Sequence, residues 1–123
     1  DIPLDARRAT WQTRLARRAM ASLRGHFTRV LTRHGARSTD HFAGFVWTGN
    51  YTADDLLALI SQLPAGVTEF MCHPGEMGPE LAQARTRLKE SRAAELVALL
   101  DSRLRPALAR EGVQLARYRD LAD

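Results

Sequence analysis

One stretch of this chain predicts its structure more firmly than the rest: residues 66–75, with the sequence GVTEFMCHPG. The run 67–72 is short, mostly apolar and bounded by glycine on one side and by His-Pro-Gly on the other, which is typical of a buried β-strand that ends abruptly. In parallel α/β proteins, reactive side chains lie at the carboxyl ends of strands, where loops open a crevice. His73 follows the predicted strand directly and is therefore our leading candidate for a catalytic residue.

The backbone around His73 is expected to stay extended, because Pro74 disfavours helical geometry at the residue before it. Side chains of an extended chain alternate between two faces. The alternation predicts that Val67, Glu69, Met71 and His73 share one face. Glu69 is therefore expected to support His73 from the same side.

The length of 123 residues is that of one domain, 1–123, and the composition, 45% hydrophobic and 26% charged, is ordinary for a soluble globular protein. No apolar run approaches the 18 residues of a membrane span, and the first residues lack the basic and apolar regions of a secretory signal. The single cysteine, Cys72, excludes an internal disulfide and is compatible with a reducing compartment. These features predict a cytoplasmic protein.

The net charge of +4 is concentrated in one segment, because residues 1–37 hold nine Arg against two Asp. A basic helix of this kind raises the hypothesis of a nucleic-acid binder, which would bind with a steep dependence on salt. A binding surface of that type interleaves aromatic or small polar side chains with the charge. A solvated helix face explains the pattern better, and we expect no nucleic-acid partner.

The first 35 residues form the predicted helical segment. The helix is expected over 6–34, where apolar residues recur every three to four positions. Gly25 is expected to kink it or break it in two, and Gly35 to stop it. The apolar positions are Trp11, Leu15, Ala19, Leu23, Phe27, Val30 and Leu31.

A short strand is expected over 36–41, followed by an aromatic loop that reaches Tyr51. Asp40 and His41 place a carboxylate beside an imidazole, a pair suited to acid/base catalysis or to metal ligation. Neighbouring residues of a strand point to opposite faces, so at most one of the two enters a given site. The alternative is a loop whose aromatic side chains only cover the core.

The rest of the chain alternates helices and strands. Thr52 and Asp55 have the spacing of a capping box at the start of a helix that Pro64 ends. The pattern further predicts a lid-like loop over 74–88, and then a helix over 89–100 whose inward side chains are Leu96, Val97, Leu99 and Leu100. A second helix is expected to be capped at Asp101–Ser102 and closed by Gly112. A strand is expected over 113–118. This order favours a parallel sheet with helices as crossovers.

Four segments of the chain resemble one known family: TDHFAG at 39–44, LPAGVTEFMCHPG at 63–75, ESRAAEL at 90–96 and GVQLARYRDL at 112–121. They are similar, in the same order, to the carboxy-terminal half of the YdjC-like carbohydrate deacetylases. The resemblance covers residues 36–121, and the segment ending in His-Pro-Gly is its most specific part. The Arg-rich helix is also similar to the branch associated with hopanoid biosynthesis.

The resemblance implies a metal-dependent hydrolase on a (β/α) barrel-like fold, which removes N-acetyl groups from amino sugars with the help of a divalent ion, Mg²⁺ or Zn²⁺. It makes His73 the histidine of the His-Pro-Gly motif, a general acid or a substrate contact. By the same resemblance Asp40 lines the mouth of the site, and Arg92 orients an acidic partner.

The family's metal-binding motifs belong to its amino-terminal half, and nothing in residues 1–37 matches them. We therefore expect a partial barrel, with the helical segment 1–35 followed by α/β units over 36–123, which binds no metal and is inactive alone. A cut barrel exposes its core and a sheet edge, so it should associate with itself or with the missing half. The alternative is a small non-catalytic α/β binding or assembly module.

Overall fold

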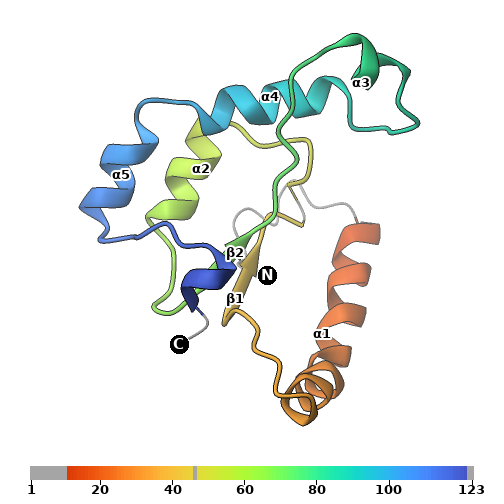
Figure 1. Cartoon of the computed structure of the whole chain (residues 1–123), viewed down its shortest axis with the longest axis vertical. Coiled ribbons are helices and arrows are strands. Elements are labelled where there is room, and N and C mark those ends of the chain that lie inside the picture. The colour runs from red at the N-terminus through yellow and green to blue at the C-terminus, as the bar shows by residue number, and fades with distance from the viewer. Residues whose placement is uncertain (1–10, 46, 122–123) are drawn as a thin grey trace. The chain divides into compact units, whose positions relative to one another are not determined.

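The structure of the chain, a computed structural model, describes residues 11–45 and 47–121 (Figure 1). These residues form helices and a small sheet, so the predicted mixed α/β class is confirmed. In chain order the elements are α1 (Trp11–Arg33), β1 (His41–Ala43), α2 (Ala53–Ile60), β2 (Thr68–Phe70), α3 (Pro79–Gln83), α4 (Glu90–Leu99), α5 (Leu104–Arg110) and the 3-10 helix η1 (Tyr118–Leu121).

The described residues divide into two compact units, each built from separate stretches of the chain. The first unit contains the residues up to Thr48 together with Pro64–Cys72, and so holds α1 and both strands. The second contains Gly49–Leu63 and the chain from His73 onward, and so holds the remaining helices.

In the first unit β1 and β2 pair in parallel, as predicted, with His41 opposite Thr68 and Ala43 opposite Phe70. One hydrogen bond beyond each end prolongs the ladder: His41 N–H donates to Val67 O at 3.0 Å, and Met71 N–H donates to Ala43 O at 2.9 Å. The described residues show a sheet of two strands.

The strand expected over 36–41 is wrong except for its last residue, because β1 begins at His41. Residues just after α1 are still engaged in the end of that helix. Ala36 N–H donates to Leu31 O at 2.9 Å, and Gly35, with φ of +63°, reverses the backbone. Gly35 therefore stops the helix as predicted, and the chain becomes extended only later.

Helix α1 is continuous through Gly25, so a break into two helices is wrong. A single glycine costs a helix only about 1 kcal/mol, which the flanking turns tolerate. The part of the helix expected over 6–10 lies outside the described residues. Several apolar positions of α1 are exposed, among them Trp11 at 72%, Leu23 at 63% and Phe27 at 60%.

Gly44 follows β1 and turns the chain away from the sheet. Its φ is +103°, a conformation that favours glycine, and a Cβ atom there would overlap the carbonyl oxygen of Met71 and lie 3.1 Å from its nitrogen. Trp47 N–H donates to Gly44 O at 3.1 Å and closes the turn. The end of the sheet therefore depends on a glycine at position 44, because only a residue without a Cβ atom fits there.

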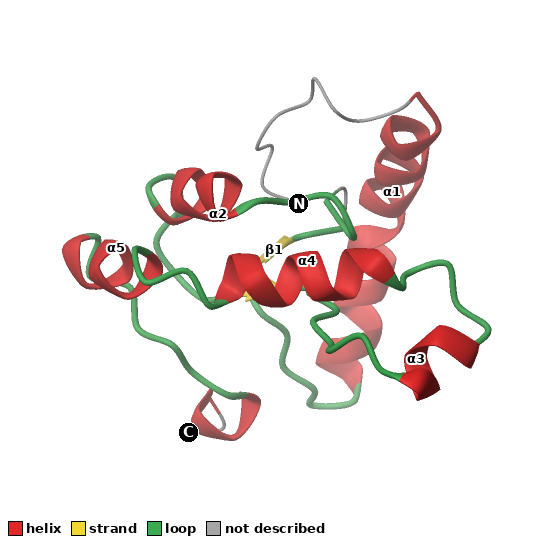
Figure 2. Ribbon diagram, turned by 90° about the horizontal axis from the view of Figure 1, so that it is seen from above, coloured by secondary structure: helices red, strands yellow, loops and turns green. Residues whose placement is uncertain are grey.

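The second unit is built around α2, which contacts both α4 and α5; Figure 1 and Figure 2 both show α2 beside α5. The predicted capping box is confirmed, since Asp55 N–H donates to Thr52 Oγ1 at 3.3 Å and Thr52 N–H donates to Asp55 Oδ2 at 2.8 Å. The buried apolar side chains of this unit are Tyr51, Leu56, Leu59, Ile60, Ala98, Leu104 and Ala107.

The inward face predicted for α4 is wrong at two positions, since Val97 and Leu100 are both 73% exposed. The buried residues of α4 are Glu95, 1% exposed, and Ala98, 5% exposed. A spacing of three residues puts these two on one helix face. The most buried residues of α4 are therefore a glutamate and an alanine, while Leu96 and Leu99 of the predicted inward face are half-buried.

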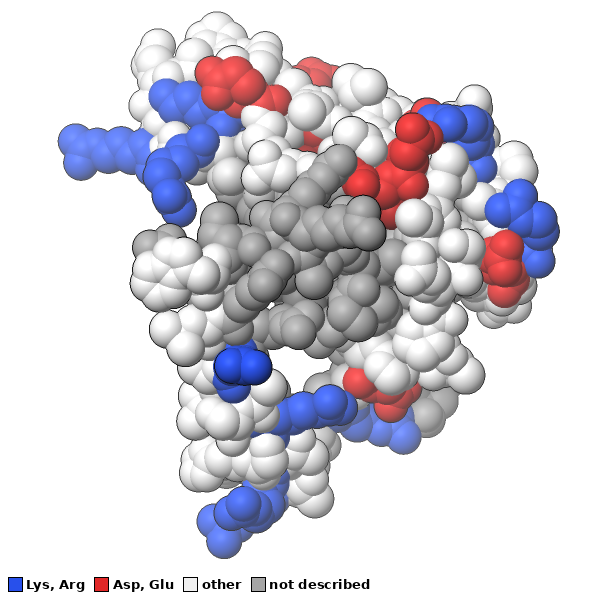
Figure 3. All heavy atoms as spheres, turned by 180° about the vertical axis from the view of Figure 1, so that it is seen from behind, with Lys and Arg blue, Asp and Glu red and all other residues white. Residues whose placement is uncertain are grey.

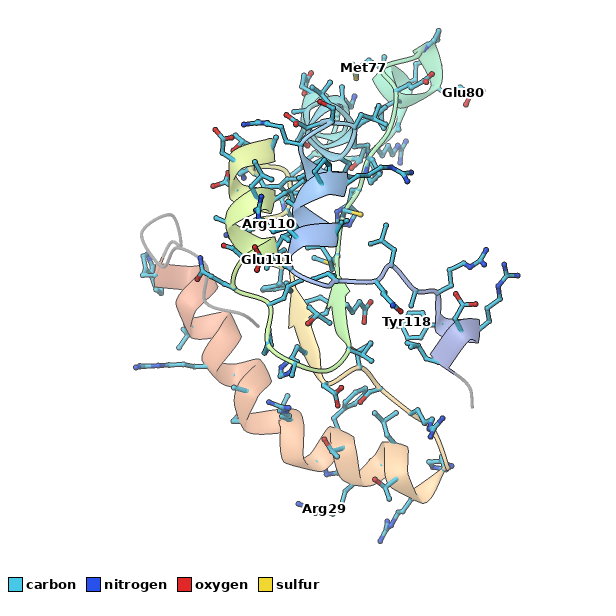
Figure 4. The ribbon with its side chains drawn as sticks, turned by 90° about the vertical axis from the view of Figure 1, so that its left-hand side faces the viewer. Arg29, Met77, Glu80, Arg110, Glu111 and Tyr118 are labelled. Atoms are coloured by element: carbon cyan, nitrogen blue, oxygen red, sulfur yellow. The ribbon has the colours of Figure 1, made fainter. Side chains whose placement is uncertain are left out.

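The segment expected as a loop over 74–88 contains the short helix α3, because Pro79 suits the first helical position and Glu80 the positive end of a helix. Figure 4 shows Met77 and Glu80 at this helix, and Met77 is 49% exposed. Lys89 Nζ donates to Ala82 O at 2.6 Å and ties the end of the segment back to α3.

The strand expected over 113–118 is wrong. Gly112, with φ of +66°, ends α5 as predicted, and Val113 N–H still donates to Leu108 O at 2.9 Å. Farther on, Arg117 N–H donates to the Asp120 carboxylate at 2.9 Å and leads into η1, where Figure 4 shows Tyr118. These local bonds occupy backbone groups that a strand would offer to a neighbour.

Asp101 does not cap α5, whose first residue is Leu104. Its carboxylate instead accepts from the backbone N–H and the Nε of Arg103, both at 2.9 Å. The Arg103 Nη1 also donates to Asp54 at the start of α2, at 2.9 Å. The hydrogen bonds from Arg103 lower the pKa of Asp101 from 3.8 to about 2.

Asp101→Asn is expected to destabilise the chain at pH 5 but to have little effect near pH 2. The folded-state pKa of Asp101 is depressed, so its stabilisation is present above its unfolded pKa near 3.8 and is lost as the pH falls toward 2. Urea unfolding of both proteins between pH 2 and 6 measures the difference. A difference that does not change with pH would contradict an ionised Asp101 as its source.

Charged side chains of both signs share the surface that Figure 3 draws, where basic groups stand next to acidic ones at several points. Ion pairs in the second unit include Arg110 with Glu111 at 3.1 Å, labelled in Figure 4, and Arg117 with Asp120 at 3.3 Å. Within the described part of the chain, no helix combines the length and apolar character needed to cross a membrane.

Candidate functional site

The candidate site lies in the second unit, where the chain enters it at His73. Strand β2 ends at Phe70, two residues before the predicted end, so His73 lies three residues beyond the strand instead of directly after it. The backbone N–H of His73 donates to Glu95 Oε2 at 2.6 Å. Helix α4, rather than the sheet, therefore holds His73 in this unit.

Glu95 is the most buried charged residue of the described chain, with 1% of its surface exposed. Besides His73, it accepts hydrogen bonds from Gly49 N–H at 2.6 Å and from the Tyr51 hydroxyl at 3.0 Å. Hydrogen bonds to an ionised group are short and strong, and a buried charge needs them to offset the loss of water. The carboxylate thus joins three segments of the unit: the loop before α2, the His-Pro-Gly segment and α4.

Glu95 is not among the site residues predicted from the sequence. The signal that could have found it is its position: a glutamate in line with the apolar Ala98 on the face of α4 that turns inward. A charged residue on an apolar face is rarely buried unless it has partners.

Arg92, predicted as a site residue, is brought together with His73. Its Nη1 lies 3.5 Å from His73 O, while its Nε donates to Leu88 O at 2.9 Å. Gly75 N–H donates to Arg92 O at 3.2 Å, and a Cβ at Gly75 would lie 3.6 Å from the Arg92 side chain. The His-Pro-Gly segment therefore packs closely along one face of α4.

The imidazole ring of His73 has one buried nitrogen without a hydrogen-bond partner among the described residues. Its Nδ1 is buried and, among the described residues, has no hydrogen-bond partner; the same holds for Ser91 Oγ on α4. A buried polar atom without a partner costs about 1–3 kcal/mol, so such atoms are uncommon and often belong to functional sites. The half-buried His73 is thus the residue here with an unused ring nitrogen.

Asp40 and Glu69, the other two predicted site residues, belong to the first unit. Asp40 Oδ2 accepts from Val67 N–H at 2.9 Å, at the end of the sheet where both strands begin. A Cβ on Gly66, whose φ is +108°, would lie 2.8 Å from this carboxylate, so Asp40 fixes the turn into β2. Glu69 lies within β2, half-buried, opposite Phe42.

His41, considered with Asp40 as an acid/base or metal-ligating pair, uses its ring to hold the same turn, with Nε2 3.2 Å from Ala65 O. Among the residues that the structure describes, no three His, Cys, Asp or Glu side chains lie together as metal ligands would. The described residues therefore do not fit a metal site of their own.

The chain belongs to the YdjC-like protein family, whose model matches residues 2–110. A carbohydrate deacetylase from Geobacillus stearothermophilus is 33% identical to the chain over 88 residues, which are 71% of this chain and 36% of that enzyme. The chain thus spans little more than a third of the length of this relative. No solved structure matches it. The family predicted from the His-Pro-Gly segment is confirmed, while the hopanoid-associated branch stays a prediction.

Proposed function

We propose that this chain is part of a metal-dependent N-deacetylase that acts on N-acetylated amino sugars. Its membership of the YdjC-like family and its similarity to a carbohydrate deacetylase support the class of reaction. The observation that carries the proposal is local: the histidine of the His-Pro-Gly motif is held at its backbone by Glu95 and approached by Arg92, and it has an unused ring nitrogen.

The reaction breaks the amide C–N bond of the N-acetyl group, joins the oxygen of water to the carbonyl carbon and returns a proton to the departing nitrogen. In our proposal His73 donates that proton as general acid, a role that histidine fills more often than any other residue. Arg92 keeps the backbone of the motif in place. Asp40 at the mouth of the site and Glu69 as a supporting residue remain proposed roles.

The fold of the whole enzyme is proposed to be a (β/α) barrel, to which this chain contributes the carboxy-terminal half. The divalent ion, Mg²⁺ or Zn²⁺, would then be held by residues other than those described, since these make no metal site. The exposed apolar side chains of α1 support association with the other half of the barrel or with a second copy. The sequence holds a single cysteine, Cys72, and therefore no internal disulfide, so the proposed location is the cytoplasm.

Acetate release from N-acetylated amino sugars tests this proposal. We expect the protein from the complete reading frame to release acetate when Mg²⁺ or Zn²⁺ is added and to stop when the ion is chelated, whereas the 123-residue chain releases none. A complete protein that releases no acetate with either ion would rule the proposal out. It would favour the non-catalytic module instead.

A further inference from the structure

We propose that Glu95 is the positioning residue of the site: it fixes the backbone of His73 and so sets the direction of the imidazole. The effect on catalysis rests on the proposed function. The positioning of His73 rests on the contacts that α4 makes with it. The sequence pattern did not assign this role to Glu95.

Helix α4 holds His73 from both sides of its backbone. Glu95 accepts from the His73 N–H at 2.6 Å, and Arg92, one turn earlier on the same helix face, reaches the His73 carbonyl at 3.5 Å. Gly75 N–H adds a bond to the Arg92 carbonyl at 3.2 Å. With both of its peptide groups bound to one helix, His73 has little freedom left, and the direction of its Cα–Cβ bond follows.

The contact requires a carboxylate. Glu95 receives three donors on two oxygens: Gly49 N–H on Oε1, and the Tyr51 hydroxyl with His73 N–H on Oε2. A glutamine has nearly the same shape but offers one acceptor oxygen, and its NH₂ group would face a donor. Glu95→Gln therefore must lose at least one of these bonds and repel another donor.

A purely structural Glu95 would join Gly49 and Tyr51 to α4 without influencing the imidazole. Two facts favour the positioning role. The shared oxygen Oε2 bonds to the backbone of His73 itself, and the ring of that residue has a buried Nδ1 that no described side chain anchors. The orientation of the ring therefore depends on the backbone, and the backbone depends on Glu95.

The first test is nuclear magnetic resonance of the labelled 123-residue chain, which needs no substrate. In the unmodified chain we expect scalar coupling between the His73 amide nitrogen and the Glu95 carboxyl carbon, and one rotamer of the His73 ring. In Glu95→Gln, where one acceptor oxygen faces three donors, the coupling should weaken or vanish, and the ring signals of His73 should shift and report several rotamers. Tyr51→Phe, the matched control, removes one donor and should keep the coupling.

If Glu95→Gln does not fold, the coupling and the ring rotamers measured in the unmodified chain and in Tyr51→Phe still test the proposal. Absence of the coupling, or several ring rotamers in the unmodified chain, would overturn the proposal. So would a folded Glu95→Gln whose His73 ring signals match those of the unmodified chain.

The second test uses the complete deacetylase. Glu95→Gln should lower kcat roughly 10- to 100-fold, the loss expected when a catalytic group moves by about 1 Å, and leave KM unchanged. A change in KM alone would count against positioning. If the complete wild-type protein has no activity, the proposed function fails, but the resonance test still decides the role of Glu95.

Discussion

Replacing His73 by glutamine is expected to lower kcat for acetate release by the complete enzyme roughly 10²- to 10⁴-fold, the usual contribution of a general acid. Glutamine can fill the space and form hydrogen bonds, but it has no proton to give to the departing amine. KM should change little, because the proton is transferred only in the transition state. Steady-state kinetics on an N-acetylated amino sugar measure both constants.

The matched control is His34→Gln, which changes an exposed histidine just after the end of α1. It should keep the activity of the wild type. Retention of more than about a tenth of kcat in His73→Gln would show that another group protonates the amine. His73 would then be at most a substrate contact.

Gly44→Ala is expected to destabilise the chain by roughly 2–4 kcal/mol, a large fraction of the 5–15 kcal/mol of a typical domain. Two costs combine at this position. The alanine would have to adopt a φ of +103°, and its Cβ would overlap the carbonyl oxygen of Met71. Because Met71 N–H donates to Ala43 O, relief of the overlap would loosen the end of the sheet. Urea unfolding compares the variant with the wild type.

Gly25→Ala provides the control within the same unit. Gly25 lies inside α1, a Cβ there meets no atom within 4 Å, and its backbone is helical, so the change should stabilise the chain by about 0.5–1 kcal/mol. If Gly44→Ala unfolds at the same urea concentration as the wild type, the turn after β1 is not fixed in the conformation described here.

Features that depend on neighbours in the sequence could be predicted. The capping box of Thr52 and Asp55 depends on four consecutive residues, and it is present. The run 67–72 does contain a strand, but β2 covers only Thr68–Phe70 and so ends two residues earlier than predicted. Gly35 and Gly112 stop helices as predicted, since each adopts the positive φ that a helix end uses.

Features that depend on residues far apart in the sequence could not be predicted. The burial of Glu95 follows from donors in two other segments, which no helix pattern reveals. The apolar spacing of α4 misled for the same reason, because Val97 and Leu100 have the right residue type but lie on the exposed face. Residues 113–118 have strand-like composition, yet local bonds such as Arg117 N–H to Asp120 lead the chain into a 3-10 helix instead.

The partners of Glu95 also bear on how the chain folds. Its three hydrogen bonds join residues 22, 44 and 46 positions apart, whereas the capping box of α2 closes over three. Closing long loops costs more chain entropy and is slower than forming local turns. The helices can therefore form first, and the His73 environment is completed only when two remote segments meet the Glu95 carboxylate of α4. Local unfolding should also begin there, so His73 is exposed to solvent before α2 is lost.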